Sequence, residues 1–210
     1  MLRLYSVKRT ERIVEQQAEW IEKVARQYGI PSACMKAVLR KEIAEIDLLD
    51  VAADLAVRLN WLRSGIARPF RHGPEVIRGK GLFRKRDSST GYAQIFAAVA
   101  IDAANYAMER GLETAAGLEM LQERRPDRRN ADDLCAMWRR LARDKAYNIR
   151  LGTLNLIAAA EEMNGHTDFA RYTPEEYQRA FTRYNANVRT VTDYGREVYG
   201  YFLRYGGEGH

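Results

Sequence analysis

The chain has little of what several classes of protein require. Its 210 residues include two cysteines, Cys34 and Cys135, and 3 histidines. Two cysteines cannot form the disulfide framework of a small secreted domain. With so few histidines and no Cys-x-x-Cys pair, a zinc site held by protein ligands is not expected either. The sequence therefore predicts no metal and no cofactor.

Long apolar runs are also absent. No stretch approaches the roughly 18 apolar residues that a membrane span needs, so we expect no transmembrane segment. From Lys8 onward the N-terminal region carries charges every few positions, and it lacks the apolar centre and small-residue cleavage site of a secretory signal peptide. For a protein that acts outside the cell, export by another route, release during phage lysis, or a leader missing from this chain all stay open.

What the chain does have is the composition of a folded protein. Apolar residues make up 46 % and charged residues 30 %, which argues against disorder. The formal net charge is +6, which favours an anionic partner. The length suits one domain with a full core, or one domain with an inserted subdomain.

Apolar residues recur at helical spacing through most of the chain, which predicts an all-α fold. We expect helices over 10–28, from 32 to a break near 46–50, on to 62, and over 93–108, 131–142, 146–163, 174–184 and 193–205. Thr10 is expected to cap the first helix, and Gly29 and Pro31 to end it. Asp47 or Asp50 is expected to cap the third.

Residues 64–91 interrupt this pattern with five of the 15 glycines and two of the 5 prolines. The composition predicts a loop or small hairpin, and a long loop inside a compact domain is usually functional. Our domain hypothesis is an N-terminal helix over 1–29 that packs on a domain over 30–205, in which 64–91 lines a cleft. The tail, 206–210, is expected to fray.

Glu42 lies on an apolar helix face, where a core residue would be expected. The apolar residues one or two turns away on this face are Met35, Val38, Leu39 and Ile46. Burial would raise the pKa of such a carboxyl and keep it protonated near neutrality, as a general acid requires. Arg40 and Lys41 are expected to point elsewhere. The alternative is a helix-surface glutamate that is solvated or paired with arginine.

Three further motifs carry polar and aromatic groups beside expected helices. They are Ser-Ser-Thr-Gly-Tyr-Ala-Gln-Ile at 88–95, Tyr-Asn-Ile-Arg-Leu-Gly at 147–152, and Tyr-Asn-Ala-Asn-Val at 184–188 followed by Tyr194. Gln94 could hydrogen-bond a ligand amide or hydroxyl, and the Tyr-Asn pairs suit sugar rings and N-acetyl groups. The alternative is that these residues cap helices and pack in the core.

In chain order, these motifs resemble the lysozyme-like superfamily of lytic transglycosylases. The pattern is Ile-Pro-x5-Ala-x4-Glu, Ser-Ser-x-Gly-x-x-Gln-Ile, Tyr-Asn-Ile-x-Leu-Gly, and Ala-x3-Tyr-Asn with a later tyrosine, over about 30–205. The Arg-Asp-Ser-Ser-Thr-Gly stretch and the C-terminal Tyr-Asn helix are also similar to goose-type lysozyme. The resemblance implies a mainly helical, lysozyme-like domain with a glycan cleft.

The resemblance also implies an activity: cleavage of the β-1,4 bond between N-acetylmuramic acid and N-acetylglucosamine in peptidoglycan. By match, Glu42 is the catalytic acid. The matched substrate-binding positions are Ser89, Gly91, Gln94, Asn148, Tyr184, Asn185 and Tyr194. A lytic transglycosylase needs no second carboxylate, whereas a goose-type inverting muramidase does, and Asp87 is the candidate. Asp87 as a loop cap or an arginine partner is the alternative.

The chain departs from the family's pattern in several places. Ile43 and Ala44 follow the glutamate, where the family usually has serine and an aromatic residue. Asn187 stands where a glycine usually follows Tyr-Asn, although asparagine tolerates left-handed backbone. The stretch between Glu42 and Gln94 is also longer than usual. These differences indicate a divergent member, so a catalytically silent glycan-binding relative stays open.

The expected partners and location follow from the same hypothesis. The partner is the glycan strand of peptidoglycan, at the bacterial cell wall in the periplasm or outside the cell. Phage or secretion-apparatus proteins are further candidate partners, and the chain is expected to be a monomer. The basic cluster at 78–86 would face the anionic wall. A nucleic-acid binder is the rival, but no recognition motif accompanies the cluster, so no specific nucleic acid is expected.

Overall fold

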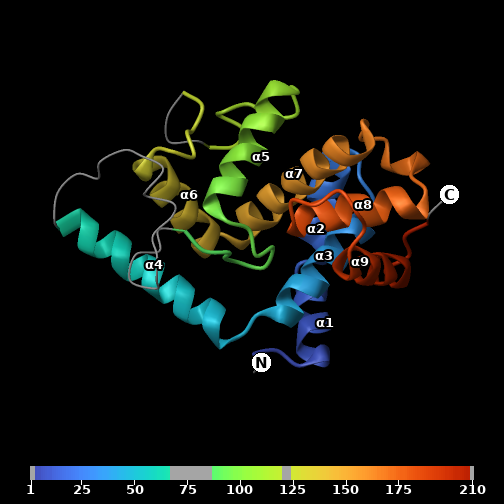
Figure 1. Ribbon diagram of the computed structural model, residues 1–210, viewed down its shortest axis with the longest axis horizontal. Helices are drawn as coiled ribbons and strands as arrows, with labels where there is room; N and C mark the ends of the chain where they lie inside the picture. Colours follow the sequence, from blue (N-terminus) through green and yellow to red (C-terminus); the bar gives the residue numbers. More distant parts are fainter. Residues whose placement is uncertain (1–2, 67–86, 120–123, 209–210) are drawn as a thin grey trace. The chain divides into compact units, whose positions relative to one another are not determined.

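The computed structural model describes residues 3–66, 87–119 and 124–208. Over these ranges the chain forms nine α-helices and one 3-10 helix, and no β-strand (Figure 1). The prediction of an all-α fold is confirmed. None of the helices in these ranges is long and apolar enough to span a membrane. The chain divides into two compact units, one made of Met1–Leu4 with Ile46–Asn148 and the other of Tyr5–Glu45 with Ile149–His210.

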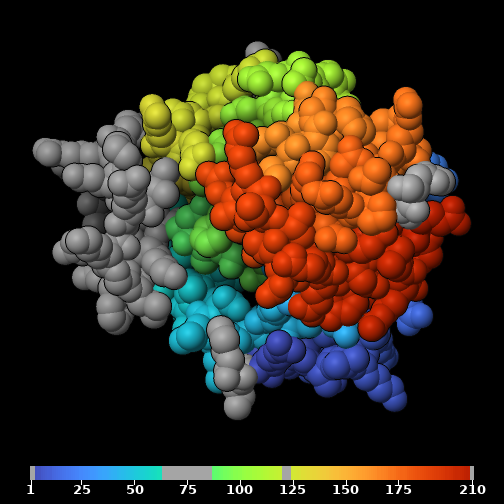
Figure 2. Space-filling view, turned by 45° about the vertical axis from the view of Figure 1, so that its right-hand side comes forward, coloured from blue at the N-terminus to red at the C-terminus, as the bar shows by residue number. Residues whose placement is uncertain are grey.

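The unit containing Glu42 is a helical assembly from both ends of the chain. Its elements are α1 (Val7–Gln16), α2 (Ala18–Tyr28), α3 (Ser32–Glu45), all but the start of α7 (Lys145–Asn164), the 3-10 helix η3 (Phe169–Arg171), α8 (Pro174–Asn185) and α9 (Asp193–Arg204). Helix α9 packs against both α8 and α3. Figure 2 shows α8 and α9, in orange and red, as one continuous surface.

The expected single helix over 10–28 is wrong, because Gln17 separates α1 from α2. Ser6 rather than Thr10 caps α1, and its Oγ accepts the Arg9 N–H at 3.3 Å. Thr10 lies inside the helix, fully buried, and donates its hydroxyl to the Ser6 carbonyl at 3.1 Å. Gly29 ends α2, as predicted, and its backbone is left-handed (φ 69°).

Aromatic rings form the core where η3, α8 and α9 meet. The rings in contact are Phe169, Tyr172, Tyr177, Phe181, Tyr199 and Phe202. Tyr177 also donates its hydroxyl to the Phe169 carbonyl at 2.6 Å, which satisfies the buried phenol. A capping box at Thr173 and Glu176 sets the start of α8. These contacts fix α9 against α8, so the direction of the α9 side chains is defined.

The other unit contains α4 (Leu48–Ile66), α5 (Ala97–Glu109), α6 (Ala131–Arg143) and the first turn of α7. The Asp47 carboxylate accepts the N–H groups of Leu49 and Asp50 at 2.7 and 3.1 Å, which confirms the cap predicted for α4. The helix runs to Ile66, so the loop predicted from residue 64 begins later. Residues 67–86 of that predicted loop lie outside the described residues, whereas 87–91 are described.

The later helices match their predictions to within one residue, except α5. It starts at Ala97 instead of residue 93, because residues 91–94 form a turn that a Thr90–Ile95 bridge closes. At the C-terminus, Gly206 and Gly207 were expected to fray. Instead their N–H groups bond to the Leu203 and Phe202 carbonyls at 3.1 and 3.0 Å, and so close α9 with a Schellman motif.

Candidate functional site

Glu42 lies in a helix that is buried on almost every side. Its side chain is 9 % exposed, and Met35, Val38 and Leu39 on the same face are fully buried, as the spacing predicted. Arg40 and Lys41, which the spacing places away from this face, are also buried, at 5 % and 7 % exposed. The physical reason is that α1, α2 and α9 all pack against α3 and cover its polar side as well.

Two tyrosines that are far from Glu42 in the sequence, Tyr184 and Tyr194, lie near its carboxylate. Tyr194, in the first turn of α9, donates its hydroxyl to Glu42 Oε1. Burial raises the pKa of Tyr194 well above its ordinary value, and the charge of Glu42 raises it further. The pKa of Tyr184 is raised by the same two causes. Both phenols therefore stay protonated at neutral pH and can act as hydrogen-bond donors.

Lys41 adds a positive charge next to this group. Its Nζ pairs with Glu197 Oε2 at 2.5 Å and with Glu45 Oε1 at 2.7 Å. The same Nζ lies 5.7 Å from the centre of the Tyr194 ring. Burial disfavours the charged form of Lys41, but the hydrogen bonds to Glu197 and Glu45 outweigh it and raise its pKa.

Sequence reasoning missed this cluster. The Lys41–Glu45 pair has the i, i+4 spacing of a helix pair and was detectable. Glu197 was not, because only the packing of α9 on α3 brings it to Lys41.

A glycine sets the approach of α9 to α8 beside Tyr194. A Cβ atom at Gly195 would lie 2.1 Å from Thr182 Oγ1 and 2.4 Å from the Gln178 carbonyl oxygen, so no larger residue fits without movement. Thr192 caps α9, and its N–H bonds to Thr182 Oγ1 at 3.1 Å. These contacts orient the first turn of α9, and with it the Tyr194 side chain.

The remaining residues of the Tyr-Asn motif lie at the end of α8. Asn185 is its last residue and is exposed. The tolerance of Asn187 for left-handed backbone is not used, because Asn187 is not among the residues with positive φ. The chain leaves the helix through an extended Ala186 instead (φ −144°, ψ 145°).

In the other unit, Asn148 organises the turn that contains Gly91. The Asn148 side chain is fully buried. Its Oδ1 accepts the Ala93 N–H at 2.8 Å and its Nδ2 donates to the Thr90 carbonyl at 2.9 Å. Gly91 has φ 71°, and a Cβ atom there would lie 2.3 Å from Asn148 Nδ2. The two motif residues are thus in direct contact, and Asn148 acts on this turn as a positioning residue.

Gln94 lies at the end of the same turn in an unusual conformation. Its φ is 44°, a left-handed value that costs free energy in a residue other than glycine. Its Nε2 donates to the Gly91 carbonyl at 2.6 Å, which holds the side chain against the turn. Ser89 is partly exposed, and its hydroxyl makes no hydrogen bond to any residue in the described ranges.

A buried polar network that sequence reasoning also missed supports the turn. Asp54 on α4 accepts the hydroxyls of Ser88 and Thr90 at 2.5 and 2.9 Å. Trp138 on α6 donates its indole N–H to Ser88 Oγ at 2.9 Å. Burial raises the pKa of Asp54. No motif links the three elements, so only the packed structure identifies Asp54 as an anchor.

Asp87 holds the start of α5. Its two carboxylate oxygens accept the N–H groups of Ala97 and Ala98, each at 2.9 Å. Burial raises the pKa of Asp87 to about 6, although these hydrogen bonds oppose the change. These contacts cap a helix. The alternatives stated from the sequence were a loop cap and an arginine partner. Arg84 and Arg86, the nearest arginines in the sequence with which Asp87 could pair, lie outside the described residues.

The candidate site residues thus form two groups. Glu42, Tyr184, Asn185 and Tyr194 belong to one unit, and Asp87, Ser89, Gly91, Gln94 and Asn148 to the other. Within the described parts of the chain, no cluster of three or more histidine, cysteine, aspartate or glutamate residues could hold a metal ion.

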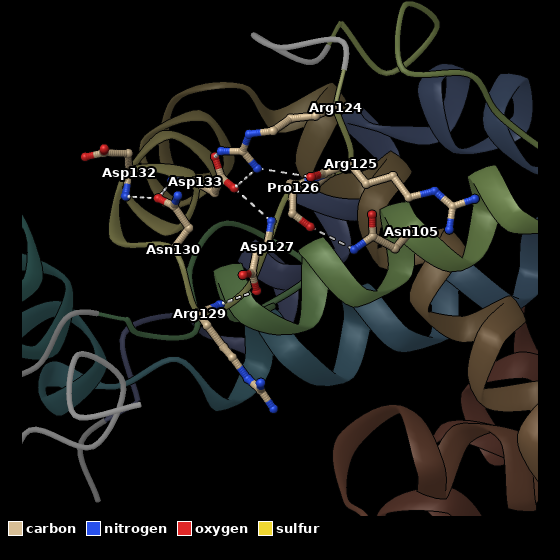
Figure 3. Close-up of polar contacts among 9 residues, drawn as sticks. All are labelled: Asn105, Arg124, Arg125, Pro126, Asp127, Arg129, Asn130, Asp132 and Asp133. Carbon is tan, nitrogen blue, oxygen red and sulfur yellow. Dashed lines mark hydrogen bonds and ion pairs between the residues drawn. The ribbon is translucent and has the colours of Figure 1, made fainter. Parts of the chain in front are cut away.

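Three arginines in the segment before α6 pair with acidic side chains, and Figure 3 shows one of these pairs, Arg124 with Asp133. The Arg124 guanidinium makes a bidentate ion pair with the Asp133 carboxylate, at 2.7 and 2.8 Å. Arg125 pairs with Glu109 at 2.6 Å, and Arg128 pairs with Asp102. Arg124, Arg125 and Arg128 in this segment are thus each paired with an acidic side chain. The basic cluster at 78–86, on which the rival nucleic-acid hypothesis was based, lies outside the described residues.

Comparisons with protein-family models, curated proteins and solved structures found no match to this chain.

Proposed function

We propose that the protein cleaves the glycan strands of peptidoglycan as a lytic transglycosylase, with Glu42 as general acid and base. The observation that carries the proposal is the nearly buried carboxylate of Glu42, which accepts a hydrogen bond from Tyr194 with Tyr184 close by. Acid catalysis at a glycosidic oxygen requires a carboxyl group that is shielded from water and held in a fixed orientation.

In this mechanism Glu42 first donates its proton to the oxygen that links N-acetylmuramic acid to N-acetylglucosamine. The bond from that oxygen to the muramic C1 breaks, and positive charge develops on the muramic ring. The Glu42 carboxylate then takes the proton of the C6 hydroxyl, whose oxygen bonds to C1. The products are a 1,6-anhydromuramic end and a free N-acetylglucosamine end, and no water is consumed.

The contacts of Asp87 favour this route over the inverting hydrolysis of goose-type lysozyme. An inverting enzyme needs a second carboxylate that is available to activate water. Both oxygens of Asp87 already accept backbone N–H groups at the start of α5. Asp87 is therefore better suited to hold that helix than to bind a nucleophilic water.

The test is mass spectrometry of the soluble fragments that the protein releases from purified peptidoglycan. The wild type is compared with Glu42→Gln, which keeps the size of the side chain but cannot donate or accept the proton. Glu22→Gln is the matched control, since Glu22 is exposed and pairs with Lys36 at 2.8 Å. We expect anhydro fragments from the wild type and the control, and none from Glu42→Gln.

Each other outcome contradicts a defined part of the proposal. Fragments that are heavier by one water would identify a hydrolase and make Asp87→Asn the next variant. Equal release by Glu42→Gln would exclude Glu42 as the acid. No release by any variant from walls of several types would exclude the enzyme and favour the silent glycan binder, which a pull-down with wall sacculi then tests.

A further inference from the structure

Helix α4 carries a stripe of large apolar side chains on its outer face. The stripe consists of Leu48, Val51, Leu55, Leu59 and Leu62, each 50–55 % exposed. On the opposite face, Ala53, Val57 and Trp61 are buried against their own unit. A surface helix normally places polar residues on its outer face, so a continuous apolar stripe there indicates an interaction surface.

The spacing of the stripe is that of a helix–helix interface. Successive members are 3, 4, 4 and 3 positions apart. At 3.6 residues per turn, all five side chains lie within an arc of about 80° and extend along about 21 Å of the helix. Apolar residues at alternating steps of three and four allow two helices to pack side by side along their length.

The stripe is also symmetric about its central residue, Leu55. Reading outward, Val51 and Leu59 are both four positions away, and Leu48 and Leu62 are both seven positions away. A second copy of α4 in the antiparallel direction therefore places Leu48 opposite Leu62, Val51 opposite Leu59, and Leu55 opposite Leu55. Two-fold dimers need this kind of self-complementary surface, in which residue i meets j and j meets i.

We infer that the partner of the α4 stripe is a second copy of this chain, in an antiparallel dimer whose two-fold axis passes by Leu55. This proposal differs from the monomer that the sequence predicted. The same helix carries Asp54, whose carboxylate holds Ser88 and Thr90 on either side of residue 89. The dimer contact therefore lies on the element that supports the Gly91–Gln94 turn.

The first test is sedimentation equilibrium of the full chain and of two charge-insertion variants. We expect the mass to rise with concentration from 24.1 kDa toward twice that value for the wild type. Leu55→Lys puts two ammonium groups against each other at the axis, and should leave a monomer at every concentration. Leu203→Lys on α9, where the leucine is 47 % exposed, is the matched control and should dimerise like the wild type.

The second test establishes the direction of the helices. Val51→Glu and Leu59→Lys should each weaken the dimer at least tenfold. The double variant should restore it, because the introduced carboxylate of each copy then faces the introduced ammonium group of the other. In a parallel pair the double variant would place like charges together and would not recover.

Cysteine cross-linking provides an independent measure of the same geometry. In a Cys135→Ser background, Leu55→Cys should form a disulfide-linked dimer on mild oxidation. Leu48→Cys should not, because its two copies lie about 21 Å apart in the antiparallel pair, beyond the reach of a disulfide. A wild type that stays monomeric at high micromolar concentration would overturn the inference. Binding of that monomer to anionic lipid vesicles would assign the stripe to a membrane surface instead.

Discussion

Tyr194 donates its phenolic hydrogen to the carboxylate of Glu42, across 152 positions of sequence. The contact joins the first turn of α9 to the last third of α3, both within one compact unit. It connects the two residues that the motif order marked as catalytic acid and late tyrosine. The carboxylate thus has a fixed orientation in a nearly buried setting.

Replacement of Tyr194 by phenylalanine removes this donor and leaves the ring in place. We expect the free energy of unfolding to fall by about 1–3 kcal/mol, the usual cost of a buried hydrogen-bond acceptor that loses its donor. Release of peptidoglycan fragments should fall about 10- to 100-fold because Glu42 loses its orientation. Urea unfolding and fragment release measure the two effects. Tyr201→Phe, which removes a hydroxyl bonded to exposed Glu197, is the control and should change both much less. Equal effects of the two substitutions would argue against a special role for Tyr194.

Alanine substitutions at Gly91 and Gly29 distinguish the free-energy cost of backbone strain from that of steric crowding. Both have left-handed φ values, 71° and 69°, but a Cβ atom at Gly29 meets nothing within 4 Å, whereas one at Gly91 meets the Asn148 side chain. Gly29→Ala should therefore cost about 1–2 kcal/mol through backbone strain alone. Gly91→Ala should cost a further 1–3 kcal/mol or so through overpacking. Urea unfolding of the two variants gives the difference, and equal losses would mean that the Asn148 contact relaxes without cost.

Gly195 and Gly200 make a similar pair within α9. A Cβ atom at Gly195 collides with Thr182 and the Gln178 carbonyl, while one at Gly200 meets nothing within 4 Å. Gly195→Ala should destabilise the protein by about 1–3 kcal/mol because α9 must move away from α8. Gly200→Ala should stabilise it by about 0.5–1 kcal/mol, since alanine is the better helix former. Thermal unfolding of the two variants measures the direction of each change in stability. A neutral Gly195→Ala would show that the α8–α9 contact adjusts easily.

The raised pKa of Asp87, about 6 against an ordinary 3.8, predicts a dependence of stability on pH. The folded state binds the proton more tightly than the unfolded state, so unfolding releases a proton between these two values. The free energy of unfolding should therefore fall as the pH rises from about 4 to about 6, by at most about 3 kcal/mol from this group. Asp87→Asn should remove this part of the slope. Urea unfolding of the wild type and of Asp87→Asn at several pH values measures this slope. The same pH dependence in the two proteins would contradict the prediction.

Helix positions were largely predictable from the sequence because apolar spacing and caps act locally. Asp47, Gly29 and Pro174 mark their helix ends with short-range hydrogen bonds or backbone restrictions, so most boundaries were predicted to within one residue. The failures came where local signals compete. The start of α1 was predicted too late because Lys8 and Arg9 in its first turn are charged. The start of α5 was predicted too early because the strained Gln94 lies in a turn before it.

The candidate site was predictable only in part. Glu42 was detectable because a charged residue on an apolar stripe breaks the helical pattern, and its burial follows that pattern. Asp54 and Glu197 were not, because each lies on the surface of its own helix and gains its partners from elements far away in the chain. The apolar stripe of α4 was read only as a helix, since periodicity does not tell a core face from an exposed one.

By itself, the sequence determined the all-helical class, most helix ends and the burial of Glu42, since these follow from the polarity and backbone preferences of neighbouring residues. The tertiary structure alone decided which distant groups meet: Tyr194 with Glu42, Glu197 with Lys41, Asn148 with Gly91, and Asp54 with Ser88. Such pairings depend on how helices pack, and packing is set by the fit of whole surfaces rather than by the spacing of residues along one helix.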